Sequence, residues 1–135
     1  MDEHGFIRSV HRHLPRKGLT VWKINDNYRG GVPDAYYSGP KADIWIEYKY
    51  LKQIPKRAGT IIKPSLRPQQ LKWLAKEHSF GRQVYCIVGS KEGGCIFKYP
   101  EWIEGISTEA FNTNIIKQNE LAVWICSLTT KGQPP

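Results

Sequence analysis

Two carboxylates and a lysine occur in one short segment of the sequence, with a spacing that could serve chemistry on phosphate. The segment runs from Val32 to Tyr50 and reads VPDAYYSGPKADIWIEYKY. Asp34 follows a proline, whereas Glu47 and Lys49 stand two residues apart in an otherwise apolar stretch. Side chains of a strand alternate between its two faces, so Glu47 and Lys49 share one face. The opposite face carries apolar side chains, namely Ile44, Ile46 and Tyr48.

Hydrolysis of a phosphodiester is the reaction that this set of residues suits. Its transition state gathers negative charge that carboxylates cannot stabilise directly, so a hard divalent cation is needed. Mg²⁺ takes oxygen ligands and usually only one or two protein carboxylates, for which Asp34 and Glu47 are the candidates. Lys49 is placed to position the attacking water and to offset charge on the phosphate. The simpler alternative is an exposed salt bridge between Glu47 and Lys49, worth under about 1 kcal/mol.

Regular elements on either side of these residues are expected to position them. The apolar spacing, the Pro and Gly residues and the β-branched runs predict helices near both ends of the chain and strands between them. The expected helices are 2–14, 68–81 and one containing Leu121, Trp124, Ile125 and Leu128, with a short helical turn at 100–106. The expected strands are 19–24, 32–37, 43–50, 84–90 and an edge strand in 93–100. A helix leading into a buried strand indicates a mixed α/β sheet.

The length of 135 residues fits a single domain, 1–135, and 24 % charged residues are typical of a folded protein. No apolar run reaches the length of a signal peptide or a membrane span, so we expect a cytoplasmic protein with no membrane partner. The three cysteines, Cys86, Cys95 and Cys126, are odd in number and lie in apolar sequence. We expect buried thiols rather than a disulfide framework, and the histidine spacing does not favour a zinc site.

The net charge of +8 is concentrated in one stretch of the chain. Between Tyr48 and Lys76 there is no Asp or Glu, and eight cations occur there: Lys49, Lys52, Lys56, Arg57, Lys63, Arg67, Lys72 and Lys76. Such a block attracts nucleic acid by releasing condensed counterions, although a solvated basic face remains the alternative. Residues 52–68 also hold three prolines, which favours a mobile loop over a regular element, and this loop could fold over a ligand.

The sequence resembles the PD-(D/E)XK nuclease superfamily in three segments, GVPDAYY, IWIEYK and LRPQQLKW. The likeness is greatest to virus-type replication-repair nucleases (VRR-NUC) and phage Holliday junction resolvase-like members, and it covers roughly residues 3–90. It implies a restriction-endonuclease-like α/β domain, with a central mixed sheet flanked by helices. It also implies a DNA endonuclease that depends on Mg²⁺ or Mn²⁺. If a phage encodes the protein, we expect it in the cytoplasm of the host cell.

The resemblance assigns roles residue by residue. Asp34 is implied as the aspartate of the motif, Glu47 as its second carboxylate and Lys49 as its lysine, with the backbone carbonyl of Tyr48 as a further metal ligand. Glu3 matches a glutamate of the first helix, although a favourable interaction with the helix dipole explains that residue equally well. Gln70 is the best match to a glutamine of the family pattern, and Gln69 competes with it.

DNA binding is expected from the basic loop and its neighbours, through Arg29, Lys52, Lys56, Arg57, Lys63 and Arg67. Nearby aromatic residues, Tyr28, Tyr36, Tyr37 and Tyr50, could stack on bases or pack in the core. Two other functions stay open, namely a noncatalytic nucleic-acid-binding module and an RNA endonuclease. A role in replication, recombination or repair with a preference for branched DNA, and a homodimer that uses the segment around Trp124, are further expectations that the sequence does not decide.

Overall fold

The computed structural model describes residues 1–24 and 30–132 of the chain. It contains both helices and strands, as expected for an α/β protein. In chain order they are α1 (Glu3–Arg12), β1 (Thr20–Lys23), β2 (Ala35–Ser38), β3 (Asp43–Tyr50), β4 (Ile61–Ile62), α2 (Pro68–Ser79), β5 (Gln83–Ser90), β6 (Gly93–Phe97), α3 (Glu101–Glu104), β7 (Ile106–Ser107), α4 (Thr108–Asn114) and α5 (Gln118–Lys131).

The main sheet is mixed and has β3 at its centre. Within the described residues it contains five strands in the order β1-β2-β3-β5-β6. β3 and β5 run parallel, whereas the other neighbouring strands are antiparallel. Parallel neighbours require a crossover connection, and the segment that includes α2 supplies it. The predicted mixed sheet and the predicted edge strand after β5 are therefore confirmed.

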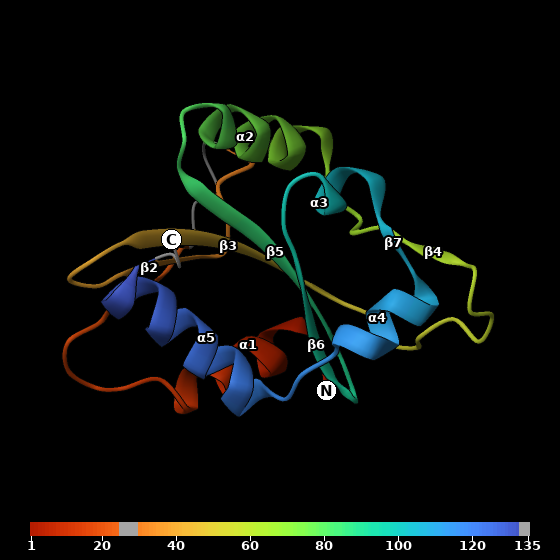
Figure 1. Cartoon of the computed structure of the whole chain (residues 1–135), viewed down its shortest axis with the longest axis horizontal. Helices are drawn as coiled ribbons and strands as arrows, with labels where there is room; N and C mark the ends of the chain where they lie inside the picture. Colours follow the sequence, from red (N-terminus) through yellow and green to blue (C-terminus); the bar gives the residue numbers. More distant parts are fainter. Residues whose placement is uncertain (25–29, 133–135) are drawn as a thin grey trace.

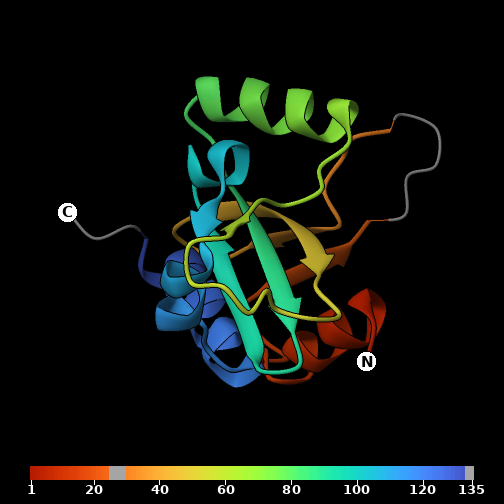
Figure 2. The same cartoon turned by 90° about the vertical axis from the view of Figure 1, so that its right-hand side faces the viewer.

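Helices cover both faces of this sheet, with α2 over one face and α1 and α5 under the other (Figures 1 and 2). Ile44, Ile46 and Tyr48 of β3 are buried in the core that α1 and α5 form with the sheet. Trp45 packs instead against the second core, to which α2 contributes Leu74. The predicted division of the two faces of β3 is confirmed, and Glu47 lies on the α2 side.

The first helix is fixed to the sheet by close packing at Phe6. The Asp2 side chain accepts a hydrogen bond from the Gly5 N–H across 2.8 Å and caps the first turn. Phe6 is buried against β5 and β6, where a Cβ added to Gly89 would come within 2.7 Å of the ring and one added to Gly94 within 2.8 Å. Glycine at both positions leaves the space that Phe6 fills. This packing fixes the position of the first turn of α1 relative to the sheet.

The expectation of an irregular mobile loop over 52–68 is wrong in part. Ile61 and Ile62 form β4, which pairs with β7, and Ile62 is buried. The carbonyl oxygen of Thr60 accepts hydrogen bonds from the backbone N–H and the hydroxyl of Thr108, across 2.8 and 2.7 Å. Two β-branched apolar residues thus attach the basic segment to the start of α4, although the prolines on either side suggest a loop.

The sequence predicts neither α4 nor β7, and the remaining differences lie at element boundaries. The second strand begins at Ala35 rather than at residue 32, so Asp34 precedes β2, because Pro33 has no N–H to offer a ladder. Cys86 and Cys95 are buried as predicted, whereas Cys126 is only half-buried. In the two described ranges, 1–24 and 30–132, no helix has both the length and the apolar character to cross a bilayer.

Candidate active site

Asp34 immediately precedes β2 and lies beside the centre of β3. Its carboxylate accepts a hydrogen bond from the backbone N–H of Tyr48 across 2.8 Å. The backbone carbonyl of Asp34 accepts a hydrogen bond from the backbone N–H of Ile24 across 2.7 Å. Hydrogen bonds to Ile24 and to Tyr48 therefore fix the position of Asp34. Ala35 pairs with Ile46 in the antiparallel register, and the same register continued by one step places Asp34 opposite Glu47. The structure therefore brings the two predicted carboxylates together.

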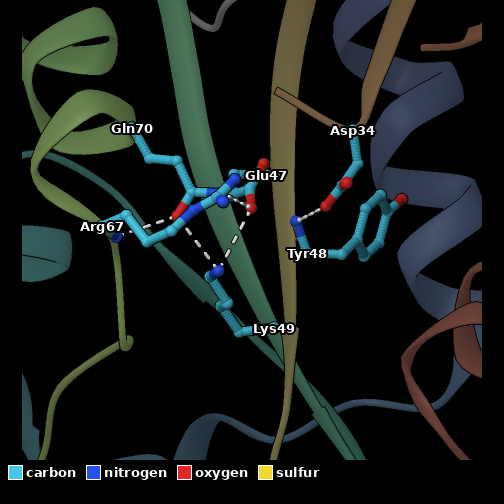
Figure 3. Close-up of polar contacts among 6 residues, drawn as sticks. All are labelled: Asp34, Glu47, Tyr48, Lys49, Arg67 and Gln70. Atoms are coloured by element: carbon cyan, nitrogen blue, oxygen red, sulfur yellow. Dashed lines mark hydrogen bonds and ion pairs between the residues drawn. The ribbon is translucent and has the colours of Figure 1, made fainter. Parts of the chain in front are cut away.

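Glu47 is a charged residue in a buried position, with 3 % of its surface exposed. Its Oε2 accepts a hydrogen bond from Nε2 of Gln70 across 2.8 Å and lies 3.4 Å from Nζ of Lys49 (Figure 3). The side chain of Lys49 is itself only 19 % exposed. The ion pair between Glu47 and Lys49 exists, but it is not the exposed strand salt bridge that the sequence left open.

The side chain of Gln70 joins Glu47, Lys49 and the start of α2. While its Nε2 donates to Glu47, its Oε1 accepts hydrogen bonds from Lys49 Nζ across 3.1 Å and from the backbone N–H of Arg67 across 2.9 Å. Pro68 opens the helix, so Gln70 stands in its first turn and faces the sheet. Gln69, the competing residue, is exposed, so the geometry favours Gln70 as a participant in the site.

Two glycines that the sequence analysis does not single out pack against α2. They determine how close the backbone before Asp34 lies to that helix. Gly30 and Gly31 both have positive φ, 66° and 81°, and both contact Gln69. A Cβ on Gly31 would come within 2.5 Å of the Gln69 carbonyl oxygen, and one on Gly30 within 2.6 Å of its Oε1. Only glycine combines this backbone conformation with such close contact. The GG pair immediately before VPD is the signal in the sequence.

The carboxyl groups of the site perturb one another. Burial raises the pKa of Glu47 to about 8, and the charge of Asp34 adds to this effect, whereas Lys49 opposes it. Burial also raises the pKa of Asp34, against the hydrogen bond from the Tyr48 N–H and the charge of Lys49. The pKa of Glu3, in the first turn of α1, is raised by burial and then by the charge of Asp34. The site therefore resists holding all its carboxylates ionised without a compensating cation.

The ring of Tyr48 points away from Glu47, into the core between the sheet and α1 (Figure 3). Its hydroxyl forms a hydrogen bond with the hydroxyl of Tyr37 across 2.7 Å, and Tyr37 in turn bonds to Nε2 of His11 across 2.7 Å. The spacing of the histidines predicts no zinc site, and it gives no sign of this series of hydrogen bonds at His11. The series links α1 to the strand residue whose N–H holds Asp34.

The predicted DNA-binding residues lie at the surface. Lys52, Lys56, Arg57, Lys63 and Arg67 are all exposed, whereas Arg29 and Tyr28 lie outside the described residues. Of the other tyrosines named for stacking, Tyr37 is buried in the core and Tyr50 is half-buried with its ring centroid 6.1 Å from that of Phe6. Tyr36 is half-buried on the α2 side of the sheet.

The chain is similar in structure to Hjc, a Holliday junction resolvase from the archaeal hyperthermophile Archaeoglobus fulgidus. The TM-score is 0.54 at 14 % sequence identity, over 91 % of this chain and 97 % of the resolvase. A solved VRR_NUC domain gives a TM-score of 0.47 at 22 % identity, over 65 % of this chain and 84 % of that domain. A scan against known protein families gives no match, and neither does a comparison with curated proteins. The likeness to the resolvase shows that this chain has the restriction-endonuclease-like fold that its resemblance to PD-(D/E)XK nucleases implies.

Proposed function

We propose that this chain is a metal-dependent endonuclease that hydrolyses phosphodiester bonds in DNA. The observation that carries the proposal is the position of Glu47, which is 3 % exposed, bonded to Gln70 and Lys49, and opposite Asp34. Burying a carboxylate costs free energy even when it is paired, and an apolar side chain at the same place would stabilise the sheet more. A role in binding a metal and in catalysis explains why charged groups occupy this position.

The donors of the site fit a hard divalent cation. Asp34, Glu47 and the backbone carbonyl of Tyr48 would hold it, and all three offer oxygen, the atom that Mg²⁺ and Mn²⁺ prefer. The raised pKa values of Asp34 and Glu47 indicate buried carboxyl groups whose ionised forms a cation would stabilise. Within residues 1–24 and 30–132, no group of three or more His, Cys, Asp or Glu side chains is arranged so that it could hold a metal ion. Mg²⁺ does not require such a cluster, since water and phosphate complete its coordination.

The residues around the carboxylates have separate tasks in this proposal. When bound, the cation would supply positive charge to the phosphate at the point of cleavage. Lys49 keeps its ammonium within 3.4 Å of Glu47 and partly open to solvent, where it orients a water and offsets charge on the phosphate. Gln70 holds Lys49 and Glu47 in place, and Glu3 adds a carboxyl group from the side of α1.

We propose DNA as the substrate because of the exposed positive charges of the protein and because of its fold. Exposed cations of the segment after β3 would contact the phosphate backbone, and they are Lys52, Lys56, Arg57 and Lys63. The structural neighbour Hjc is a Holliday junction resolvase, which makes branched DNA formed in replication, recombination or repair the first substrate to try. We expect the protein to act in the cytoplasm.

Paired cuts at a junction would call for a two-fold dimer, and we propose a homodimer as the form that makes them. Trp124 was the residue suggested for its interface. The ring centroid of Trp124 lies 4.9 Å from that of Tyr85 within the same chain, so this tryptophan already packs on its own core.

A panel of substrates tests the function. Four-way junctions, flaps, nicked duplex, plain duplex and matched RNA should each be incubated with Mg²⁺, Mn²⁺ or EDTA. We expect cleavage of DNA with either cation and none in EDTA. Preferential cleavage of RNA would make the protein an RNA endonuclease. Tight binding without cleavage in any ion would make it a noncatalytic binding module, and full activity in EDTA would remove the metal from the account.

A further inference from the structure

A row of aromatic side chains crosses the sheet on the same face as Glu47. We call it the aromatic row, and its members are Trp22 of β1, Tyr36 of β2, Trp45 of β3 and Trp73 of α2. The strand register pairs Trp22 with Tyr36 and Tyr36 with Trp45. Successive ring centroids are 6.3, 4.5 and 5.1 Å apart, so each ring contacts the next. The four rings form one continuous surface.

The aromatic row is covered at one end and open at the other. Trp73 and Trp45 are half-buried where α2 meets the sheet, whereas Trp22 on the edge strand is 55 % exposed. A cavity of about 320 Å³ opens beside Tyr36 and Trp45 and is bordered by Asp43 and Arg82. Its size is at the lower end of the range for small-ligand pockets. A large exposed ring that continues into such a cavity indicates a binding surface more than core packing.

We propose that the aromatic row binds an unpaired nucleobase of the substrate by stacking, beside the point of cleavage. This inference rests on the proposed nuclease function and names the class of DNA that the site takes. Aromatic rings stack on bases of any sequence, and nearby cations attract the backbone that carries them. On the face of the aromatic row Lys49 of β3 supplies such a charge, whereas Arg82, at the cavity, has its Nε 3.7 Å from a carboxylate oxygen of Glu77.

The charge at the cavity favours a base over a phosphate. Asp43 accepts hydrogen bonds from the hydroxyls of Tyr36 and Ser38, across 2.6 and 2.7 Å. These bonds stabilise its carboxylate, which repels a phosphate and accepts hydrogen bonds from amino groups of a base. The same bonds fix the ring of Tyr36 in the row.

The distance to the carboxylates suits a nucleotide next to the scissile phosphate. Trp22, the exposed ring of the row, pairs with Tyr36, which follows Asp34 by two residues, so the ring lies one strand over and about 7 Å along the sheet from that carboxylate. A base can reach the ring only if it is not paired and stacked in a continuous duplex. The preferred substrate therefore has unpaired bases at the edge of a duplex, as in a flap or an opened branch point.

Binding without cleavage tests the stacking. Kd should be measured in EDTA by fluorescence anisotropy for a flap with unpaired bases and for the fully paired duplex, with the parent, Trp22→Ala and Trp22→Phe. The matched control is Val21→Ala, because Val21 is 38 % exposed and neighbours Trp22 on the same strand. Melting temperatures of all variants must match that of the parent.

We expect Trp22→Ala to weaken flap binding by about five- to a hundredfold, the range for one lost base stack. Duplex binding should not change, Trp22→Phe should retain most flap binding, and Val21→Ala should behave like the parent. Unchanged flap binding by Trp22→Ala, or an equal loss on flap and duplex, would overturn the inference.

Two further outcomes separate this inference from others. If Trp22→Ala weakens flap binding but the parent cleaves no DNA with Mg²⁺, the stacking surface stands and the nuclease proposal fails. If the parent cleaves and Trp22→Ala binds and cleaves a flap equally well, only the stacking fails.

A second copy of the chain is the other occupant that the aromatic row could bind. Conversion of a dimer to a monomer by Trp22→Ala in sedimentation velocity would show an interface between copies and overturn the proposal.

Discussion

Gln70 donates a hydrogen bond to Glu47 across 2.8 Å, between the first turn of α2 and the centre of β3. The same amide accepts from Lys49 and from the backbone N–H of Arg67, where the helix begins. One side chain therefore joins the start of a helix to both charged residues of the strand. The geometry of the site depends on where α2 begins.

Gln70→Ala is expected to lower the rate of DNA cleavage by about ten- to a hundredfold, the usual effect of removing a partner that orients a metal ligand. Gln69→Ala is the matched control, because Gln69 is the adjacent residue and is exposed. Cleavage rates of the two variants on one substrate check the prediction. Equal and full activity in both would show that neither glutamine takes part.

Lys49→Ala should lower turnover far more than affinity, because Lys49 acts on the transition state in our account. We expect a fall in kcat on the order of a hundredfold with little change in the Kd for DNA. Lys52→Ala, which changes an exposed lysine of the basic segment, should mainly weaken binding. A folded Lys49→Ala protein that cleaves at the parental rate would reduce the pair with Glu47 to a structural salt bridge.

Salt should weaken DNA binding steeply. Each phosphate contact releases about 0.9 counterion on duplex DNA, so the slope of log K against log salt counts the contacts. The double variant Lys52→Ala/Lys56→Ala should flatten that slope by about 2, since both residues are exposed in the basic segment. A parental slope near zero would mean that this segment is only a solvated surface.

His11 should make the protein less stable in mild acid. Burial, and then the charge of Lys23, lowers the pKa of His11 from 6.5 to about 4 in the folded state. Between these two values the unfolded chain binds a proton that the folded chain does not, so the free energy of unfolding falls as pH decreases. After allowance for the solvent contact of the ring, the expected loss from this group is about 1 to 2 kcal/mol.

The variant His11→Gln isolates this effect, because Gln can still bond to the Tyr37 hydroxyl but does not titrate. Carboxyl groups with raised pKa values, such as Glu47, act in the opposite direction in both proteins and cancel in the comparison. Urea unfolding at pH 7 and at pH 4.5 should give a smaller acid-induced loss for the variant. An identical loss in the two proteins would rule out His11 as the cause.

The sequence predicted the elements that depend on local pattern. Alternation in β3 assigned Ile46 and Glu47 to opposite faces, and the spacing of apolar residues found the first helix and the helix that contains Leu121. These signals lie within a few residues, where the periods of strand and helix act directly. The roles of Asp34 and Glu47 are still predictions, although the structure brings both residues together.

Features that depend on distant pairing could not be read from the sequence. Ile62 pairs with Ile106 in the small sheet, and no local sequence pattern indicates a partner so far along the chain. The choice between Gln69 and Gln70 required the start of α2, since neighbouring helical residues point about 100° apart. The aromatic row joins residues of different strands through their register, which becomes visible only in the folded sheet.

Asp34→Asn offers the most direct test of the central claim, that the carboxylates of β2 and β3 carry a metal-dependent cleavage of DNA. Asn can still accept the hydrogen bond from the Tyr48 N–H, so the fold should persist and circular dichroism should match the parent. Single-turnover cleavage of a branched DNA should be measured for both proteins in Mg²⁺ and in EDTA. The account predicts cleavage by the parent in Mg²⁺ alone and a rate for Asp34→Asn lower by on the order of a hundredfold or more, with DNA binding retained. Parental rates from the folded variant, or cleavage by the parent in EDTA, would contradict it.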